Sequence, residues 1–318
     1  MFTNSNIDQE LYSTLMGTLK QCNQNLKKIE TSKEYRLGLF ANQIWCLLKH
    51  PSKWPKLIKL ATDKIAWQRV LKRYPNQELL SLNSIDDKNA KKYFSKQRFV
   101  VYTCVFGNYD SIQEPLMCPD NCDYFFIGNI ELPEGSKWKK IDLSFISHQL
   151  ESLSNVEKNR YCKMFPHILF PQYEVSIYID GNVSVISDLT EFITVERTFG
   201  MGFHYHKSRD CVYQEIAACR MLKKAPKKEL NEYESRLRQK QFPEKYGMVE
   251  CNVIVRDHCN KTMQKVMNAW WEEFRNHVKR DQLSLPFLLQ QEHIPIAAVA
   301  VLGNNVFNNP AIRIASHK

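Results

Sequence analysis

The stretch EVSIYIDGNV, residues 174–183, decides the fold of the chain. Its apolar and aromatic residues form a short β-rich run that ends in Asp180, Gly181 and Asn182, which is typical of a buried strand followed by a polar turn. An acidic side chain at the end of a buried strand is costly unless it is paired, hydrogen-bonded or bound to a cation. Asp180 and Asn182 stand two residues apart, so both side-chain oxygens can reach one hard cation. On its own the stretch is compatible with a metal site but favours an ordinary turn, because short motifs often match by chance.

Further apolar runs, alternating with helical segments, lie on both sides of this strand. The runs FVVYTCVF, CDYFFIG, GMGFHYH and VECNVIV predict strands at residues 99–106, 122–128, 200–206 and 249–255. Helices are expected at about 155–170, 210–223, 227–240 and 262–278, and after residue 280. Strands that alternate with helices predict an α/β fold with a mostly parallel sheet flanked by helices. Ligands of such sheets bind beyond the carboxyl ends of the strands, so we expect chemistry at residues 107–110 and 180–182, and around His204 and Asp281.

The N-terminal third differs from the rest in both pattern and charge. Apolar residues recur at helical spacing from about residue 7 to 96, and residues 1–96 contain 17 Lys and Arg against 8 Asp and Glu. This part carries a net charge of +9, and the remainder carries +1 of the total +10. We therefore predict two parts, a basic helical region at 1–96 and an α/β domain at 97–318.

The basic helices have two interpretations. Trp45, Trp54 and Trp67, with seven Lys or Arg between residues 53 and 73, suit helices that lie on an anionic membrane surface. An ordinary helical bundle that packs on the α/β domain or on a second subunit of a homo-oligomer has the same amphipathic pattern. Both stay open from the sequence.

Composition and cysteine usage narrow the class of protein. With 43% hydrophobic and 25% charged residues, the chain has the composition of a globular protein. It contains no apolar run of the ~20 residues that cross a bilayer, and its N-terminus does not resemble a signal peptide. The ten cysteines are scattered without a C-x-x-C pair, which favours reduced thiols and a cytoplasmic protein. Because no base-reading motif accompanies the basic third, we expect no nucleic-acid partner.

Two polar segments flank the central strand in the sequence. Arg160 and Lys163 are three residues apart and would share one face of a helix, which suits a pyrophosphate, although a solvated basic face is the commoner outcome. Later, Arg280, Asp281 and Gln282 stand together at an expected helix start, where they could orient sugar hydroxyls while Asp281 caps the helix.

A third polar segment contains His204, His206 and Arg209. No cysteine or carboxylate stands at the usual spacing to complete a zinc site around the two imidazoles. We therefore expect this segment to line the side of a pocket where an acceptor binds.

Taken in order, these segments resemble a known family. VVYTCVFGNYD, CDYFFI, NRYCKMFPHILFPQYEVSIYIDGNV, HYHKSRDCVYQE and WWEEFRNHVKRDQLSL resemble the glycosyltransferase-like domain of plant turgor-regulation and mucilage-related proteins, which has bacterial members among polysaccharide-biosynthesis enzymes. The resemblance runs from about residue 99 to about 290. The order is also similar to that of retaining GT-A enzymes of glycosyltransferase family eight. The resemblance implies a GT-A-type, Rossmann-like fold and a hexosyltransferase-type enzyme.

The resemblance also implies residue roles. Thr103, Phe106, Asn108, Tyr109 and Asp110 would surround the nucleotide base and ribose, and Arg160 and Lys163 the diphosphate or donor sugar. Asp180, Asn182 and His317 would bind Mn²⁺ or Mg²⁺, and Asp281 and Gln282 would be the catalytic pair at the anomeric carbon. His204, His206, Arg209 and Arg280 would lie on the acceptor side. The chain departs from the family-eight pattern at Asn182, where an amide replaces an acid and weakens the expected metal binding.

The function that follows is transfer of a sugar, with retention, from a nucleotide donor, expected to be a uridine diphosphate sugar. The acceptor would be a glycan or lipid-linked saccharide in the biosynthesis of a surface polysaccharide such as capsule or lipopolysaccharide, on the inner face of the membrane. Two alternatives stay open. One is a metal-dependent hydrolase of a lipid amide that uses His204 and His206. The other is a non-catalytic glycan-binding module in which Asn182 marks a lost site.

Overall fold

The computed structural model describes residues 4–49, 52, 54–75, 97–107, 110–195 and 197–315. Its N-terminal part contains the helices α1 (Asn4–Thr31), α2 (Lys33–Leu48) and α3 (Trp54–Arg73). The helical character predicted for residues 1–96 is confirmed over these three ranges, and residues 76–96 lie outside the described part of the chain.

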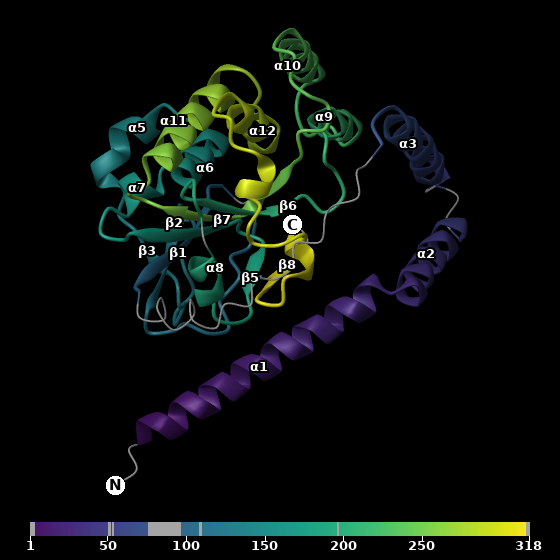
Figure 1. The fold of residues 1–318 in the computed structure, drawn as a ribbon. Helices are drawn as coiled ribbons and strands as arrows, with labels where there is room; N and C mark the ends of the chain where they lie inside the picture. The colour runs from purple at the N-terminus through teal and green to yellow at the C-terminus, as the bar shows by residue number, and fades with distance from the viewer. Residues whose placement is uncertain are drawn as a thin grey trace.

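A six-stranded sheet forms the centre of the α/β part (Figure 1). Its strands are β1 (Phe99–Val105), β2 (Cys122–Gly128), β3 (Lys139–Lys140), β4 (Val175–Ile179), β6 (Met201–Tyr205) and β7 (Val249–Asp257). They are arranged in the order β3-β2-β1-β4-β7-β6. The pairs β1–β2, β1–β4 and β2–β3 are parallel, whereas β7 is antiparallel to both β4 and β6. Within this sheet only β7 is reversed, so the predicted α/β fold, a mostly parallel sheet flanked by helices and preceded by helices, is confirmed.

The reversed direction of β7 brings its first residues to the edge where the parallel strands end. Ile179, the last residue of β4, pairs with Val253 in the middle of β7, and the N–H of Asp180 donates to the carbonyl of Asn252 at 2.9 Å. Glu250, near the start of β7, therefore extends past the end of β4. The ends of β1, β4 and β6 and the start of β7 share one edge, where the sequence predicted ligand binding.

Each face of the sheet covers its own hydrophobic core, because the side chains of a strand alternate between the two faces. Along β1, Val100, Tyr102 and Cys104 belong to one core, while Phe99 and Val101 belong to the other.

Helices contribute to the first core and cover that face of the sheet (Figure 1). They are α5 (Ser147–Glu151), α6 (Asn155–Met164), α7 (Pro166–Leu169), α9 (Val212–Met221), α10 (Lys227–Gln239), α11 (Lys261–Asn276) and α12 (Asp281–Gln291). The opposite face is covered by α8 (Thr190–Thr194) and a small antiparallel sheet of β5 (Val183–Val185) and β8 (Ile312–Ile314). Short 3-10 helices η2 (Ser144–Ile146), η3 (Ile296–Ala298) and η4 (Val306–Asn308) lie in the connections.

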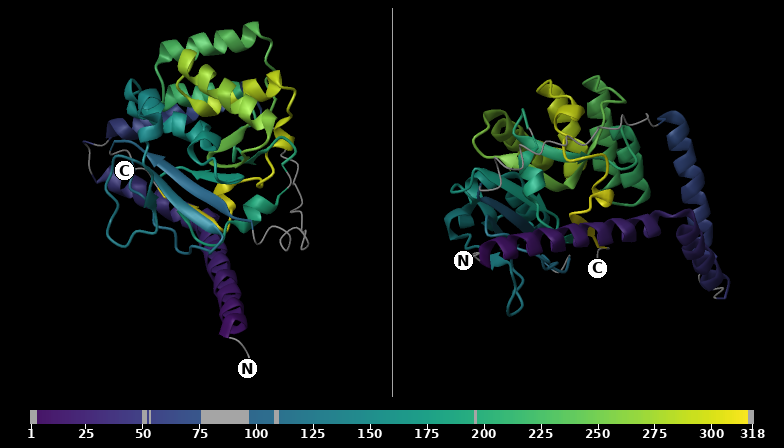
Figure 2. Two further views of the ribbon diagram at one scale, coloured as in Figure 1. Left: turned by 90° about the vertical axis from the view of Figure 1, so that its left-hand side faces the viewer. Right: turned by 60° about the horizontal axis from the view of Figure 1, so that its bottom comes forward.

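The N-terminal helices contact the α/β part at two places (Figure 2). On α1, the amide of Asn23 donates to the carbonyls of Pro310 at 2.8 Å and Ile312 at 3.2 Å, and Lys20 forms an ion pair of 2.9 Å with Glu191 of α8. At the other end of the region, α3 packs against α9. The boundary near residue 97 between a helical region and an α/β domain stays a prediction.

Two expectations about the chemistry of the chain can be compared with the structure. All ten cysteines are free thiols in the structure. None of the helices in the described ranges combines the length and the apolar character that a membrane span needs.

Candidate active site

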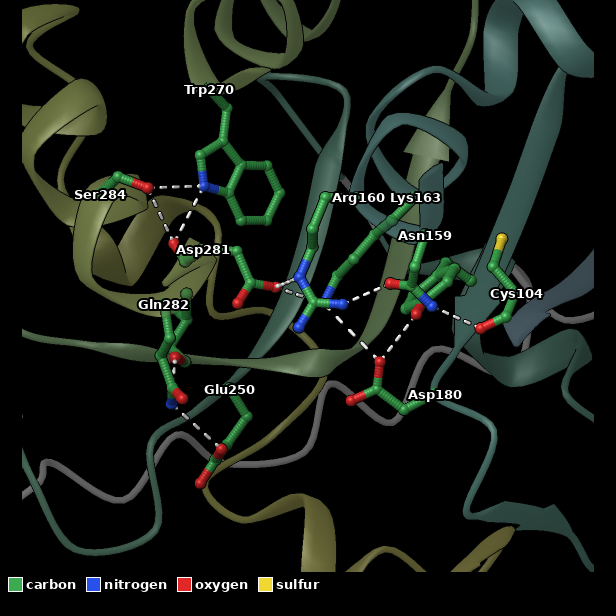
Figure 3. A network of polar contacts seen from close by, with 12 residues as sticks. Cys104, Asn159, Arg160, Lys163, Asp180, Glu250, Trp270, Asp281, Gln282 and Ser284 are labelled. Carbon is green, nitrogen blue, oxygen red and sulfur yellow. Dashed lines mark hydrogen bonds and ion pairs between the residues drawn. The ribbon is translucent and has the colours of Figure 1, made fainter. Parts of the chain in front are cut away.

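Helix α6 presents two cationic side chains on one face. Its first turn is capped from both sides, because Ser154 accepts a hydrogen bond from the N–H of Glu157 and the Glu157 carboxylate accepts one from the N–H of Ser154 at 3.0 Å. Arg160 and Lys163 follow three residues apart. Both side chains point toward Asp281 at the start of α12 (Figure 3).

A buried network holds the end of α6 against the sheet. The last carbonyls of a helix lack donors within the helix. Here the Tyr102 hydroxyl lies 3.1 Å from the carbonyl oxygen of Lys163, and Arg256 of β7 donates to that same carbonyl and, at 2.7 Å, to the Tyr102 hydroxyl. Tyr102, Lys163 and Arg256 are all buried. The network therefore fixes the backbone from which the Lys163 side chain extends.

Two cations and two carboxylates gather at the strand ends. The Lys163 ammonium lies 2.7 Å from Oδ2 of Asp281 and 3.7 Å from Oδ1 of Asp180. The Arg160 Nε lies 3.1 Å from the same Oδ2 of Asp281. We call these four side chains the charge cluster.

The charge cluster keeps Asp281 ionised despite its burial. Burial alone would raise the pKa of this carboxyl, but the charges of Arg160, Lys163 and Arg280 outweigh it and hold the pKa of Asp281 well below its usual range. Asp281 thus remains a carboxylate throughout the physiological pH range.

The cluster opens to solvent at Asp180. The side chain of Asp180 is 30% exposed, whereas Lys163 is 1% and Asp281 5% exposed. The hydroxyl of Tyr178 donates to Oδ1 of Asp180 at 2.7 Å, and burial together with this carboxylate raises the pKa of Tyr178 well above its usual value. The side chain of Arg160 is 21% exposed, so a ligand entering the charge cluster would meet Asp180 and Arg160 first.

The turn after β4 carries two side chains with oxygen donors, Asp180 and Asn182. A Cβ at Gly181 would lie 2.6 Å from Cγ2 of Val105 and 3.4 Å from Cβ of Asp110, so Asp110 lies beside this turn and only glycine fits there. The amide of Asn182 donates to the carbonyl of Ala315 at 2.8 Å, and the N–H of Ala315 donates back to the carbonyl of Asn182.

These donors fit a hard cation, which prefers carboxylate and amide oxygens. Among the described residues, no three His, Cys, Asp or Glu side chains form a metal-binding group. A cation at this turn would therefore have few protein ligands and share its coordination with phosphate, as Mg²⁺ commonly does. His317, predicted as a third ligand, lies outside the described residues.

The start of α12 is fixed by a buried tryptophan. The indole N–H of Trp270 lies 2.9 Å from the carbonyl oxygen of Asp281 and 3.1 Å from Oγ of Ser284. Asp281 does not cap the helix with its side chain; its carboxylate instead binds the two cations of α6.

A second polar cluster adjoins the first through Gln282. The Gln282 amide donates to Oε2 of Glu250 at 3.3 Å (Figure 3), and Oε1 of Glu250 lies 3.7 Å from Nε2 of His206. Nε2 of His206 is also 2.9 Å from the guanidinium of Arg209, which forms an ion pair with Glu215. Burial, with the Arg209 charge, lowers the pKa of His206 to about 3, so its imidazole is neutral.

The N-terminal helices border this second cluster. The guanidinium of Arg209 lies 5.9 Å from the centre of the Trp67 ring of α3. Trp67 and Arg209 also line a cavity of about 170 Å³ between α3 and α9.

Other predicted site residues lie apart from these clusters or outside the described residues. Thr103 is buried inside β1, and Phe106 packs against the first core. His204 is buried and contacts Asn309 at 3.2 Å, so it and His206 have different partners. Asn108 and Tyr109 lie outside the described residues. Arg280 immediately precedes α12, half-buried and close enough for its charge to act on Asp281.

Two residues of the site were not singled out from the sequence, Glu250 and Arg256. Both stand in β7, whose other residues are mostly apolar. A signal was available, because charged side chains within a buried strand must have partners.

A family model identifies the class of domain that contains this site, a glycosyltransferase-like domain. The chain belongs to the TOD1/MUCI70 family, whose glycosyltransferase-like domain matches residues 138–312, more than half of its length. The match includes the charge cluster and the Gln282–Glu250 pair. It begins later than the resemblance predicted from about residue 99, and extends beyond residue 290.

Solved structures provide more distant likenesses. The apo structure of the bifunctional glycosyltransferase WbbM is 12% identical, with a TM-score of 0.38, and the match covers 65% of this chain and 39% of that one. The apo form of mouse xyloside xylosyltransferase 1 is 7% identical, with a TM-score of 0.42, over 69% of this chain and 98% of that one. The chain thus spans about two fifths of the length of WbbM. No curated protein matches it in sequence.

Proposed function

We propose that the chain transfers a sugar from a uridine diphosphate donor to a hydroxyl group of a glycan or lipid-linked saccharide, in the biosynthesis of a surface polysaccharide. The reaction depends on Mn²⁺ or Mg²⁺ and retains the anomeric configuration. Retention rests on the similarity of the Asp281–Gln282 pair to retaining enzymes.

The charge cluster is the observation that carries this proposal. Arg160 and Lys163 approach the carboxylate of Asp281, at the start of α12, within 3.1 and 2.7 Å. Arginine offers a forked contact to phosphate and lysine a point charge, so the pair suits the diphosphate of a donor. Catalysis in such a site is mainly orientation of the donor and stabilisation of the departing diphosphate.

The metal proposal is supported by the oxygen donors of the turn after β4. Asp180 and Asn182 would hold the cation. Two hydrogen bonds connect Asn182 to Ala315, which stands two residues before His317 in the sequence. The bound cation would supply charge stabilisation for the leaving diphosphate.

Thermal unfolding with a panel of nucleoside diphosphates, with and without Mn²⁺, tests the proposal. A ligand that binds only the folded state stabilises it by about 2.7 kcal/mol at a hundredfold excess over its Kd. We expect uridine diphosphate with Mn²⁺ to raise the Tm, and Asp180→Asn to abolish the shift. Asp120→Asn, an exposed carboxylate elsewhere, is the matched control and should keep it.

Two results would contradict the proposal. The absence of a shift with every nucleotide, combined with zinc in the untreated protein, would favour the hydrolase. A shift equally large in Asp180→Asn would remove this carboxylate from the metal site.

We further propose that α2 and α3 lie on an anionic membrane surface that carries the acceptor. Leu37, Phe40 and Trp45 on α2 are 65, 59 and 60% exposed. Leu37 and Phe40, three residues apart, and Trp45, eight after Leu37, share one side of the helix. The net charge of +9 in residues 1–96 is complementary to acidic headgroups.

Co-sedimentation with vesicles tests this surface. Binding to phosphatidylglycerol vesicles should exceed binding to pure phosphatidylcholine and weaken in Phe40→Ser/Trp45→Ser. Leu116→Ser, an exposed apolar side chain of the α/β part, should leave binding unchanged. A mass that doubles with concentration and returns to monomer in the double variant would instead assign the surface to a second copy of the chain.

A further inference from the structure

The carboxyl group of Glu250 joins the two polar clusters of the site. Its Oε2 accepts a hydrogen bond from the amide of Gln282 at 3.3 Å, and its Oε1 accepts one from the backbone N–H of Lys207 at 3.3 Å. Its side chain is 11% exposed, so it is largely but not completely enclosed. Figure 3 shows Glu250 and Gln282 pointing toward one another beside the charge cluster.

The position of Glu250 follows from the reversed direction of β7. Glu250 is the second residue of this strand and lies at the edge where β4 ends in Asp180. On one side it contacts Gln282, which directly follows Asp281 and its two cations. On the other side it contacts the segment of His206 and Lys207, predicted to face the acceptor. Glu250 therefore stands between the predicted donor and acceptor regions.

The surroundings of Glu250 favour a proton acceptor. Burial raises the pKa of this carboxyl, and the backbone N–H of Lys207 and the charge of Arg209 only partly oppose the effect; the nearby Glu215 adds to it. The charge of the Lys207 ammonium also opposes the effect of burial, and His206, a further titratable neighbour, is neutral. A carboxylate whose pKa is raised toward the working pH is a better general base than one in water.

We propose that Glu250 is the catalytic base that takes the proton from the acceptor hydroxyl. This assignment rests on the proposed function. The acceptor oxygen bonds to the anomeric carbon, the bond from that carbon to the diphosphate oxygen breaks, and its electron pair leaves with the nucleoside diphosphate. The hydroxyl proton moves to the Glu250 carboxylate. Gln282 and the N–H of Lys207 orient that carboxylate, and in a single displacement with the proposed retention the acceptor oxygen approaches from the face that the diphosphate leaves.

The release of uridine diphosphate from UDP-sugars provides a test without a known acceptor. In water with Mn²⁺ the nucleophile must lose a proton, whereas azide attacks without losing one. We expect Glu250→Gln to slow release in water about 100-fold or more, as for loss of a general base. Added azide should restore release in this variant. Glu273→Gln is the control, because Glu273 is a buried carboxylate paired with Arg236 outside the site.

Thermal unfolding of the same variants separates the base from the proposed function. Glu250→Gln should keep the Tm shift with uridine diphosphate and Mn²⁺. The assignment would be overturned if Glu250→Gln released uridine diphosphate in water at an unchanged rate. It would also be overturned if this variant lost the Tm shift and azide did not restore release. In both cases the transferase proposal would stand. Absence of both a Tm shift and UDP release from every UDP-sugar in the unsubstituted protein would overturn the proposed function itself.

Discussion

Replacement of Lys163 by methionine tests the charge cluster directly. The substitution keeps an unbranched apolar stem of the same length and removes the ammonium group 2.7 Å from Asp281. Both groups are almost fully buried, and loss of one partner of a buried ion pair destabilises a protein by about 3–5 kcal/mol. Because Arg160 still pairs with Asp281, we expect the lower end, a loss of about 3 kcal/mol in the free energy of unfolding.

Urea unfolding followed by far-ultraviolet circular dichroism measures this loss. Lys163→Met, Asp281→Asn and the double variant form a cycle, in which the double variant should lose about 2 kcal/mol less than the sum of the single losses. Lys228→Met removes an exposed ammonium and should change stability by less than about 0.5 kcal/mol. A loss below about 1 kcal/mol for Lys163→Met, or simple additivity in the cycle, would refute the reasoning.

The same cycle has a defined pH dependence. The pKa of Asp281 is depressed in the folded protein, while an unfolded aspartate titrates near about 3.9. The stability that Asp281 contributes is therefore fully present above pH about 4 and is lost as the pH falls toward the folded pKa. The difference between the unsubstituted chain and Asp281→Asn should be constant from neutral pH to about 5 and shrink only in stronger acid.

Three further predictions concern the scaffold of the site. Tyr102→Phe removes the hydroxyl that bonds Arg256, and should reduce the free energy of unfolding by about 1–3 kcal/mol; a neutral effect in urea unfolding would contradict the role of this network. Gly181→Ala forces a methyl group to within 2.6 Å of Val105. It should reduce the free energy of unfolding by about 1–3 kcal/mol and weaken the nucleotide-dependent Tm shift. An unchanged Tm and an unchanged shift would show that the turn is not tight. Burial lowers the pKa of His204 and of His206 to about 3, whereas an imidazole of the unfolded chain titrates near about 6.5. The unfolded chain therefore binds more protons below pH 6.5, and the free energy of unfolding should fall as the pH drops from 6.5 toward 3, by up to about 1.4 kcal/mol per pH unit for each histidine. A urea midpoint that stays constant between pH 7 and 5 would refute this prediction.

The main elements of the fold could be predicted because their patterns are long. The strands β1, β2, β4, β6 and β7 are mostly apolar or aromatic over five residues or more, and α6, α9, α10, α11 and α12 follow helical spacing. The short strands β3, β5 and β8 contain two or three residues, too few for a period to stand out. The antiparallel direction of β7 was also outside the reach of the pattern, because an apolar run is the same in either direction.

The charge cluster was predictable for a different reason. Arg160, Lys163, Asp180 and Asp281 stand near the ends of segments whose order resembles a known family, and the carboxyl ends of parallel strands share an edge. Glu250 was not predicted as a site residue because its place at that edge depends on the reversed direction of β7. Arg256 was not predicted as a site residue because its partners, Tyr102 and the carbonyl of Lys163, are distant in sequence.

The charge balance of the site supports the proposed need for a divalent cation. Arg160 and Lys163 face Asp180 and Asp281, so the formal charges of the cluster cancel, and Arg280 adds one positive charge close by. The diphosphate of a nucleotide sugar brings two negative charges into this largely buried region. Unpaired charge is costly where water is excluded, and these five side chains would leave one negative charge of the donor unbalanced. A divalent cation at the exposed Asp180 would supply the missing charge where the cluster opens to solvent, and this is the physical reason to expect a nucleotide-dependent Tm shift only when metal is present.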